Sequence, residues 1–143
     1  MLTGQVQKSL DSKSRVNIPK KFLDRLTVDG REEVYLLCMD GCIQIYNLET
    51  WSRLASKIND LDPFDPNSRM LQRIWGSHAE QQLLDREGRV LLSDAVKQYA
   101  LINKQVIIIG AINKIEIWGL EKYRSMLPQA PSPEEIAQRI SKM

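Results

Sequence analysis

The sequence predicts an α+β, mostly β protein in which two tandem copies of one small unit fold together as a single pseudo-symmetric domain, residues 1–143. One observation is a repeat: the stretch that begins at Asp11 recurs from Asp85, an offset of 74 residues. The other is that short alternating apolar and polar runs end in turn-forming residues, which is typical of strands. So small a unit does not bury its apolar face alone, so each copy needs the other.

The two copies agree in order along their whole length. The matched segments are Asp11–Pro19 with Asp85–Ser93, Val34–Leu37 with Val106–Ile109, and Ile43–Tyr46 with Ile115–Trp118. We expect repeat one at about residues 4–60, a connection at 61–78, repeat two at about 79–127 and a C-terminal helix at 132–142. The first copy is longer around Val28 to Arg31. Interleaving the two copies would close the strands into a β-barrel with few free edges, flanked by helices.

Each copy is expected to run strand, tight turn, strand, helix, hairpin and helix. In the first copy these are Gly4–Leu10, Asp11–Ser14, Arg15–Ile18, Lys20–Leu26 with Pro19 at its first position, Val34–Cys38 with Cys42–Tyr46, and Glu49–Asn59. In the second copy the hairpin is Val106–Gly110 with Lys114–Trp118 and the last helix is Glu121–Leu127. Further helices are predicted at Ser68–Trp75 and at Pro133–Lys142, where Ser132 and Glu135 form a capping box.

Composition points to an ordinary globular protein, with 43% hydrophobic and 27% charged residues. No apolar run approaches the roughly 20 residues that cross a bilayer, and no signal peptide is recognisable. The net charge is only +2, but six bases and two acids lie between Lys8 and Arg25. Such a basic strip attracts polyanions, although a solvated helix face explains part of it equally well.

Metal binding and catalysis find little support in this sequence. Cys38, Cys42 and His78 are the only soft ligands, and a zinc site normally needs four. Both cysteines are interpreted as ordinary strand thiols, in keeping with a reducing cytoplasm. His78, expected at the start of a strand, has no recognisable partner for nucleophilic chemistry. We therefore expect no enzyme, no cofactor, no metal and no small-molecule substrate.

The duplicated Asp-x-x-x-Arg turn is the strongest functional candidate. Asp11 and Asp85 suit local capping of a tight turn. Arg15 and Arg89 follow those turns and should point away from the buried neighbour Val16 or its equivalent, towards solvent. Arginine has a planar fork suited to phosphates and guanine edges. A structural salt bridge from each arginine to its own aspartate remains the alternative.

The residues Leu10 to Phe22 resemble the swapped-hairpin DNA-binding module of AbrB-type transition-state regulators. Two tandem copies of such a motif in one chain resemble the MraZ family, bacterial regulators encoded at the start of the division and cell-wall gene cluster. The resemblance covers Gly4 to Met126 and includes the hairpin end Ile115–Trp118. It implies a swapped-hairpin barrel and a homo-oligomeric ring. It also implies a cytoplasmic, nucleoid-associated repressor that binds repeated boxes in the promoter of its own operon.

Carried over by position, the resemblance implies DNA contacts from Arg15 and Arg89, with Lys13, Arg86 and Lys8 as further candidates. The more basic first copy is expected to make the main contact. Two rival functions stay open: an AbrB-like antitoxin that binds a toxin, and an oligomer that binds protein without a primary DNA role.

The first copy departs from the family turn at one position. The family pattern is Asp-x-x-Gly-Arg, as in Asp85 to Arg89, but Ser14 stands in place of the glycine. If that position requires a positive φ, serine costs about 1 kcal/mol there. We therefore expect the first turn to differ in shape, which leaves the exact aim of Arg15 open.

Overall fold

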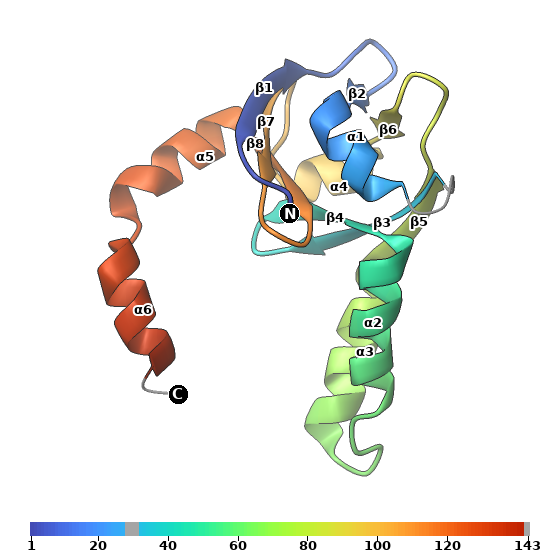
Figure 1. The fold of residues 1–143 in the computed structure, drawn as a ribbon, viewed down its shortest axis with the longest axis vertical. Helices are drawn as coiled ribbons and strands as arrows, with labels where there is room; N and C mark the ends of the chain where they lie inside the picture. The colour runs from blue at the N-terminus through green and yellow to red at the C-terminus, as the bar shows by residue number, and fades with distance from the viewer. Residues whose placement is uncertain (28–31, 142–143) are drawn as a thin grey trace.

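The structure is a computed structural model that describes residues 1–27 and 32–141 (Figure 1). Its strands are β1 (Gln5–Ser9), β2 (Arg15–Asn17), β3 (Glu33–Met39), β4 (Cys42–Asn47), β5 (Ala79–Leu83), β6 (Arg89–Leu91), β7 (Gln105–Gly110) and β8 (Ile115–Gly119). Its helices are α1 (Lys20–Leu26), α2 (Leu48–Asn59), α3 (Pro66–His78), α4 (Asp94–Tyr99), α5 (Leu120–Met126), α6 (Pro133–Ser141) and the short 3-10 helix η1 (Leu127–Gln129). The longer loop expected around Val28 to Arg31, and Lys142 of the last helix, lie outside the described residues.

The two copies are interleaved, as predicted, and they interleave by exchanging their first strands. A six-stranded antiparallel sheet has the order β1-β7-β8-β4-β3-β5, so β1 pairs with the hairpin of the second copy and β5 with that of the first. The registers are equivalent: Val6 lies opposite Ile108 in one pair, and Glu80 lies opposite Leu36 in the other. The chain is thus an α+β fold with an internal pseudo-two-fold axis that passes between β4 and β8.

The expected closure into a barrel does not occur. Among the described strands, β1 and β5 are the edges of the six-stranded sheet, and β2 and β6 form a separate two-stranded sheet. The physical reason is that each edge strand leads into a turn that directs the chain into β2 or β6, so the edges diverge instead of pairing. The two sheets are held together by side-chain packing in the core and not by a continuous hydrogen-bonded ladder.

One apolar core joins both copies. Val16 and Val90, directly opposite each other on β2 and β6, are both 0% exposed. They pack in the same cluster as Phe22 from α1 and as Ile45 and Ile117 from the central strands. A smaller cluster on the other face of the sheet joins β4, β7, β8 and α5. The central strands are therefore buried on both faces.

Local signals in the sequence explain most element ends. The hairpin turn after β3 has φ of 59° at Asp40 and 78° at Gly41, the left-handed pair that Asp-Gly favours. Pro19 is the N-cap of α1 instead of its first residue. The helix expected at Ser68–Trp75 extends to His78, so His78 ends α3 and does not begin a strand. Its ring Nδ1 lies 2.9 Å from the carbonyl oxygen of Ile74, a contact within the last helical turn.

The central position of β8 gives a stability prediction. Ile117 is 0% exposed and packs in the core shared by both copies, whereas Leu83 on edge strand β5 is 73% exposed. Ile117→Ala should lower the free energy of unfolding by about 2–5 kcal/mol, because it deletes buried groups and leaves a cavity. Leu83→Ala should change it by less than about 0.5 kcal/mol. Chemical denaturation measures both; equal effects would contradict the shared core.

Candidate nucleic-acid interface

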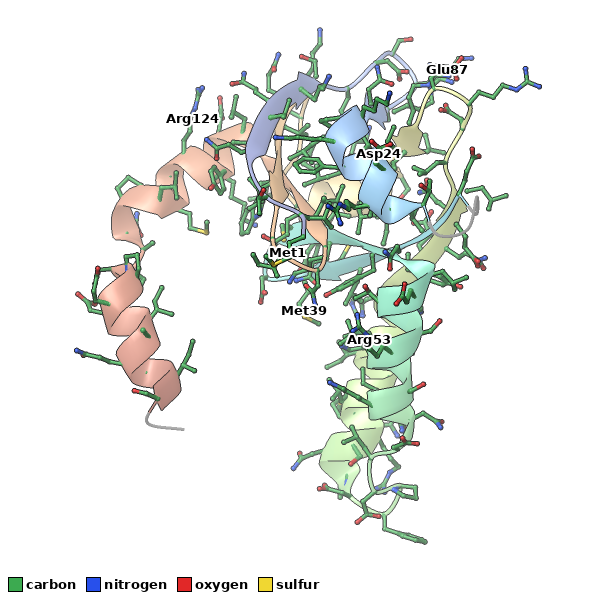
Figure 2. The ribbon with its side chains drawn as sticks, viewed as in Figure 1. Met1, Asp24, Met39, Arg53, Glu87 and Arg124 are labelled. Atoms are coloured by element: carbon green, nitrogen blue, oxygen red, sulfur yellow. The ribbon has the colours of Figure 1, made fainter. Side chains whose placement is uncertain are left out.

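The pairing of β2 with β6 brings the two arginine turns onto one edge of the molecule. In this pair Arg15 lies opposite Leu91, and Asn17 lies opposite Arg89. Figure 2 shows Glu87 at the tip of the second turn, beside the turn of the first copy and far from Arg124 on α5. Two segments whose aspartates, Asp11 and Asp85, are 74 positions apart therefore form one surface.

Each aspartate organises its own turn through the same set of bonds. The Oδ1 atom of Asp11 accepts hydrogen bonds from the backbone N–H groups of Lys13 and Arg15, both at 2.9 Å. The Oδ1 atom of Asp85 accepts from the N–H groups of Glu87 and Arg89, at 3.0 and 2.8 Å. These are the local side-chain-to-backbone bonds for which aspartate is favoured in turns. The predicted capping role of both aspartates is confirmed.

The serine of the first turn does not change its shape. Ser14 has φ of 61° and Gly88 has φ of 72°, so both adopt the left-handed conformation. The N–H of each donates to the carbonyl oxygen of its aspartate at 3.0 Å. The expectation that the two turns would differ in shape is therefore wrong, because the aspartate bonds hold the serine in a conformation that costs it roughly 1–2 kcal/mol.

A contact across the pseudo-axis explains why one copy has serine and the other glycine. The Oγ of Ser14 accepts a hydrogen bond from the Nζ of Lys97 on α4 at 2.6 Å. The equivalent partner of Gly88 is Leu23 on α1, and a Cβ added at Gly88 would collide with the Leu23 side chain. Serine thus faces a polar partner, and glycine leaves room for an apolar one. No feature of a single turn reveals this pairing, since it joins residues from different copies.

The arginines do not extend freely into solvent; each forms the salt bridge that the sequence left open as an alternative. The Nε of Arg15 donates to Oδ2 of Asp11 at 2.8 Å, and the Nε of Arg89 donates to Oδ2 of Asp85 at 2.7 Å. Their side chains keep 30% and 24% of their surface exposed. Partly exposed pairs of this kind contribute roughly 0–1 kcal/mol to stability. Their clearer effect is to fix the direction of each guanidinium.

The two guanidinium groups differ in how many acids surround them. Arg89 also donates from Nη2 to Glu87 at 3.2 Å, and its Nη1 lies 3.8 Å from Asp11. The Arg15 side chain donates only through Nε, and within residues 1–27 and 32–141 no hydrogen bond from its two terminal nitrogens is found. A guanidinium held through Nε presents those nitrogens end-on, the geometry that binds phosphate or guanine bidentately. Arg15 is therefore the better placed of the two for a ligand.

The remaining candidate bases lie around this pair. Lys13 and Arg86 are exposed within the two turns. Lys8 is half-buried on β1, opposite Val106, and takes no part in the bonds that join the two turns. The exposed bases Lys20 and Lys21 begin α1, the helix that follows β2. The basic strip of the first copy thus runs from the turn onto α1.

The bonds of the turns lower the pKa of both aspartates. For Asp11 the hydrogen bond from the Arg15 N–H contributes most, and it outweighs the opposing effect of desolvation. For Asp85 desolvation acts to raise the pKa, but the combined hydrogen bonds and charge of Arg89 overcome it. The hydrogen bond to Asp85 in turn raises the pKa of Arg89. The bonds of the turns therefore favour the charged form of both aspartates.

No second site of this kind competes with the turns in the described parts of the chain. Burial raises the pKa of the Cys38 thiol and, more strongly, that of the Cys42 thiol, which disfavours the thiolate needed for reactivity. Residues 1–27 and 32–141 contain no cluster of three or more His, Cys, Asp or Glu side chains fit for a metal ion. Within the same ranges, no helix has the length and apolar character of a membrane span.

Comparison with known proteins agrees with this geometry. A family described as "MraZ protein, putative antitoxin-like" matches residues 1–74 and 76–142. A Transcriptional regulator MraZ of Natranaerobius thermophilus is 38% identical over 141 residues, which cover 98% of this chain and 96% of that protein. The protein of the same name from Clostridium acetobutylicum is 34% identical over 143 residues, and that from Haemophilus influenzae Rd is 32% identical over 133.

A strand-exchanged pair of arginine turns, in a chain with such relatives, defines a transcriptional regulator and not an enzyme. The chain belongs to the MraZ family, as its sequence motifs implied.

The contrast between Ser14 and Gly88 gives a test of the turn geometry. Gly88→Ala should destabilise the protein by about 2 kcal/mol or more, because it adds the left-handed cost and crowds Leu23. Ser14→Gly should change stability by no more than about 1 kcal/mol, because relief of strain offsets the lost bond to Lys97. Thermal and denaturant unfolding compare the two; a harmless Gly88→Ala would contradict the packing described.

The lowered aspartate pKa values predict how stability depends on pH. An unfolded aspartate titrates near 3.9, and Asp11 and Asp85 titrate lower in the fold. Their contribution is therefore complete above about pH 5 and is lost as the pH falls through the folded pKa. The double variant Asp11→Asn, Asp85→Asn should show a shallower loss of stability below about pH 4. Denaturant titrations across that range provide the measurement; an unchanged slope would count against these pairs.

Proposed function

We propose that the protein is a sequence-specific DNA-binding repressor of its own operon. In this proposal a ring of several chains binds repeated boxes in the promoter, and the protein acts in the cytoplasm in association with the nucleoid. The observation that carries the proposal is the single surface made by the two turns, where Arg15 is held through Nε with its terminal nitrogens outward. The names of the relatives support regulation of transcription, and DNA is the ligand that suits such a surface.

The chemistry of the surface favours a duplex over a small ligand. Arg15 is fit to read a guanine edge or to clamp a phosphate, because its planar fork donates two parallel bonds. Lys13 and Arg86 would hold neighbouring phosphates, and Lys8 is a weaker candidate on β1. Phosphate contacts set register and base contacts set sequence. In this proposal Arg15 supplies the base contact, and Lys13 and Arg86 supply the phosphate contacts.

The two copies are proposed to contribute unequally. Three carboxylates surround Arg89, from Asp85, Glu87 and Asp11, while Arg15 has one close carboxylate partner. Since DNA is a polyanion, the acids around Arg89 oppose its approach. The first copy therefore makes the main contact, and Arg89 supports it.

Several weak contacts must act together for useful affinity. One chain offers only a few bases, so a single box should bind weakly. Several chains joined in a ring would meet several boxes at once, and each contact raises the effective concentration for the next. In this proposal the affinity for DNA therefore depends on both the repetition of the boxes and the assembly of several chains.

A gel-shift titration with DNA from upstream of the protein's own gene tests the proposal. Arg15→Ala should weaken binding by about 1–3 kcal/mol for each chain engaged, and Arg89→Ala by less. The control is Arg124→Ala, which removes an exposed arginine on α5 far from the turns (Figure 2). For the wild type, log affinity should fall steeply with log salt, by about 0.9 for each phosphate neutralised.

Loss of binding with Arg15→Ala at unchanged stability supports the assignment. Wild-type protein that is folded but does not shift this DNA would contradict a DNA-binding role and favour a protein ligand. Equal loss with all three variants would place the DNA elsewhere.

A further inference from the structure

Among residues 1–27 and 32–141, the C-terminal helix α6 is not covered by any other part of the fold. Every residue from Pro133 to Ser141 is exposed, and Figure 2 shows the helix standing clear of the sheets. Its first turn is nonetheless well built, since the Oγ of Ser132 accepts from the Glu135 N–H at 3.2 Å. Ile136 and Ile140, at spacing i, i+4, are 41% and 65% exposed. Isolated helices shorter than about 12 residues are marginal in water, so α6 requires an apolar surface to pack on.

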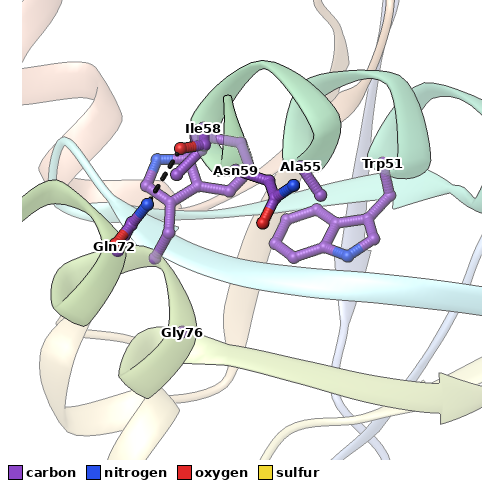
Figure 3. Close-up of a pocket in the computed structure, with 7 residues that line it drawn as sticks. Trp51, Ala55, Ile58, Asn59, Gln72 and Gly76 are labelled. Carbon is purple, nitrogen blue, oxygen red and sulfur yellow. Dashed lines mark hydrogen bonds between the residues drawn. The ribbon is translucent and has the colours of Figure 1, made fainter. Parts of the chain in front are cut away.

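An open apolar pocket lies in the helical hairpin formed by α2 and α3. It has a volume of about 300 Å³; Trp51, Ala55, Ile58 and Trp75 make most of its lining apolar, and Asn59 and Gln72 add polar side chains (Figure 3). The rings of Trp51 and Trp75 stack with centroids 4.9 Å apart and form a broad aromatic wall. At Gly76 no atom lies within 4 Å of where a Cβ would stand, which leaves the rim open. The pocket suits aliphatic side chains presented by a helix.

The charges of α6 and α3 are complementary. The first turn of α6 carries Glu134 and Glu135. Helix α3 carries Arg69 and Arg73 and no acidic residue. Arg69, Arg73 and Gly76 follow one another at i, i+4 and i+7, so they share one stripe of α3, and Gly76 of that stripe lines the pocket. The Nη1 of Arg69 donates to the carbonyl oxygen of Pro63 at 3.0 Å. A helix that entered with its isoleucines down would bring its carboxylates towards these arginines.

The positions of the two features favour contact between copies. In Figure 1, α6 follows α5 on one side of the sheet, while α2 and α3 project from the side where β3 and β5 lie. An interface between two different surfaces is head-to-tail, and repetition of such an interface builds a ring when its rotation closes.

We infer that α6 of one chain docks into the α2–α3 pocket of a second copy of this chain. Ile136 and Ile140 enter the pocket between the helices, and Glu134 faces the arginines of α3. The inference rests on the ring in the proposed function and names the surfaces that hold it. It also accounts for the helical hairpin, which has no counterpart in the second repeat.

Two variants that disable opposite halves of the contact test it by sedimentation velocity without DNA. The arm variant, Ile136→Asp with Ile140→Asp, alters only exposed side chains. The groove variant, Ala55→Arg, places a charged side chain in the pocket. Leu83→Asp, at an exposed apolar position on β5, is the control. Wild type and control should be multimeric, and each variant alone should be monomeric.

Mixing the two variants gives the decisive result. An equimolar mixture should form dimers, because the intact α6 of the groove variant fits the intact pocket of the arm variant. A mixture that stays monomeric, as docking of α6 within its own chain would give, overturns the inference. So does an arm or groove variant that assembles like wild type, and in that case the proposed ring stands on another interface. Wild-type protein that is monomeric contradicts both the inference and the ring, while the gel shift still judges DNA binding.

Discussion

The pairing of β2 with β6 is the constraint on which the rest of the structure depends. These strands have three residues each, too few to be stable alone, and they meet at Val16 and Val90. Both valines are fully buried in a core that includes helices and central strands of both copies. For the two short strands to meet, each copy must send its first strand to the hairpin of the other. Strand exchange, a common core and adjacent turns are consequences of the same pairing.

That pairing also sets the electrostatics of the functional surface. Aspartate and arginine in the same turn make a compact pair in which one carboxylate organises the backbone and aims the guanidinium. The aspartate neutralises part of the positive charge that the arginine could offer to a polyanion. It also restricts the rotamers of the arginine before binding, so that binding loses less side-chain entropy. The balance differs between the copies, since Glu87 and Asp11 add negative charge around Arg89 and leave Arg15 less neutralised. The two copies thus differ in the charge around their arginines because of single residues such as Glu87.

Much of the fold was readable from the sequence because its signals are local or repeated. The Asp-Gly turn, the Ser132 cap and the matching order of segments in the two copies led to the correct hairpins, the C-terminal helix and the interleaving of the copies. Barrel closure could not be judged, because it depends on whether β1 and β5 come within hydrogen-bonding reach after the exchange. The error at His78 has a similar cause. Helix α3 packs on α2, and this tertiary contact extends the helix to His78, where the local sequence had predicted the start of a strand.

The candidate site was predicted in its residues but not in its geometry. The spacing of Asp11 and Arg15 suggested both a salt bridge and a free arginine, and only the folded turn decides between them. The shape of the Ser14 turn was mistaken because the bonds of Asp11 hold serine in the left-handed conformation, and the partner of its hydroxyl, Lys97, comes from the other copy, beyond any sequence window. The pocket between α2 and α3 was likewise invisible, since it requires two helices separated by a proline-containing connection to lie side by side.

The most direct test of the central claim, that the paired turns face DNA, is site-specific photo-crosslinking. A photoreactive residue would be placed at Ser12, exposed in the first turn, or at Ser125, exposed on α5. With DNA from upstream of the protein's own gene, we predict a covalent protein–DNA product from Ser12 and none from Ser125. A product from Ser125 alone, in protein that still shifts the same DNA, would contradict the assignment of the turns as the DNA-binding surface.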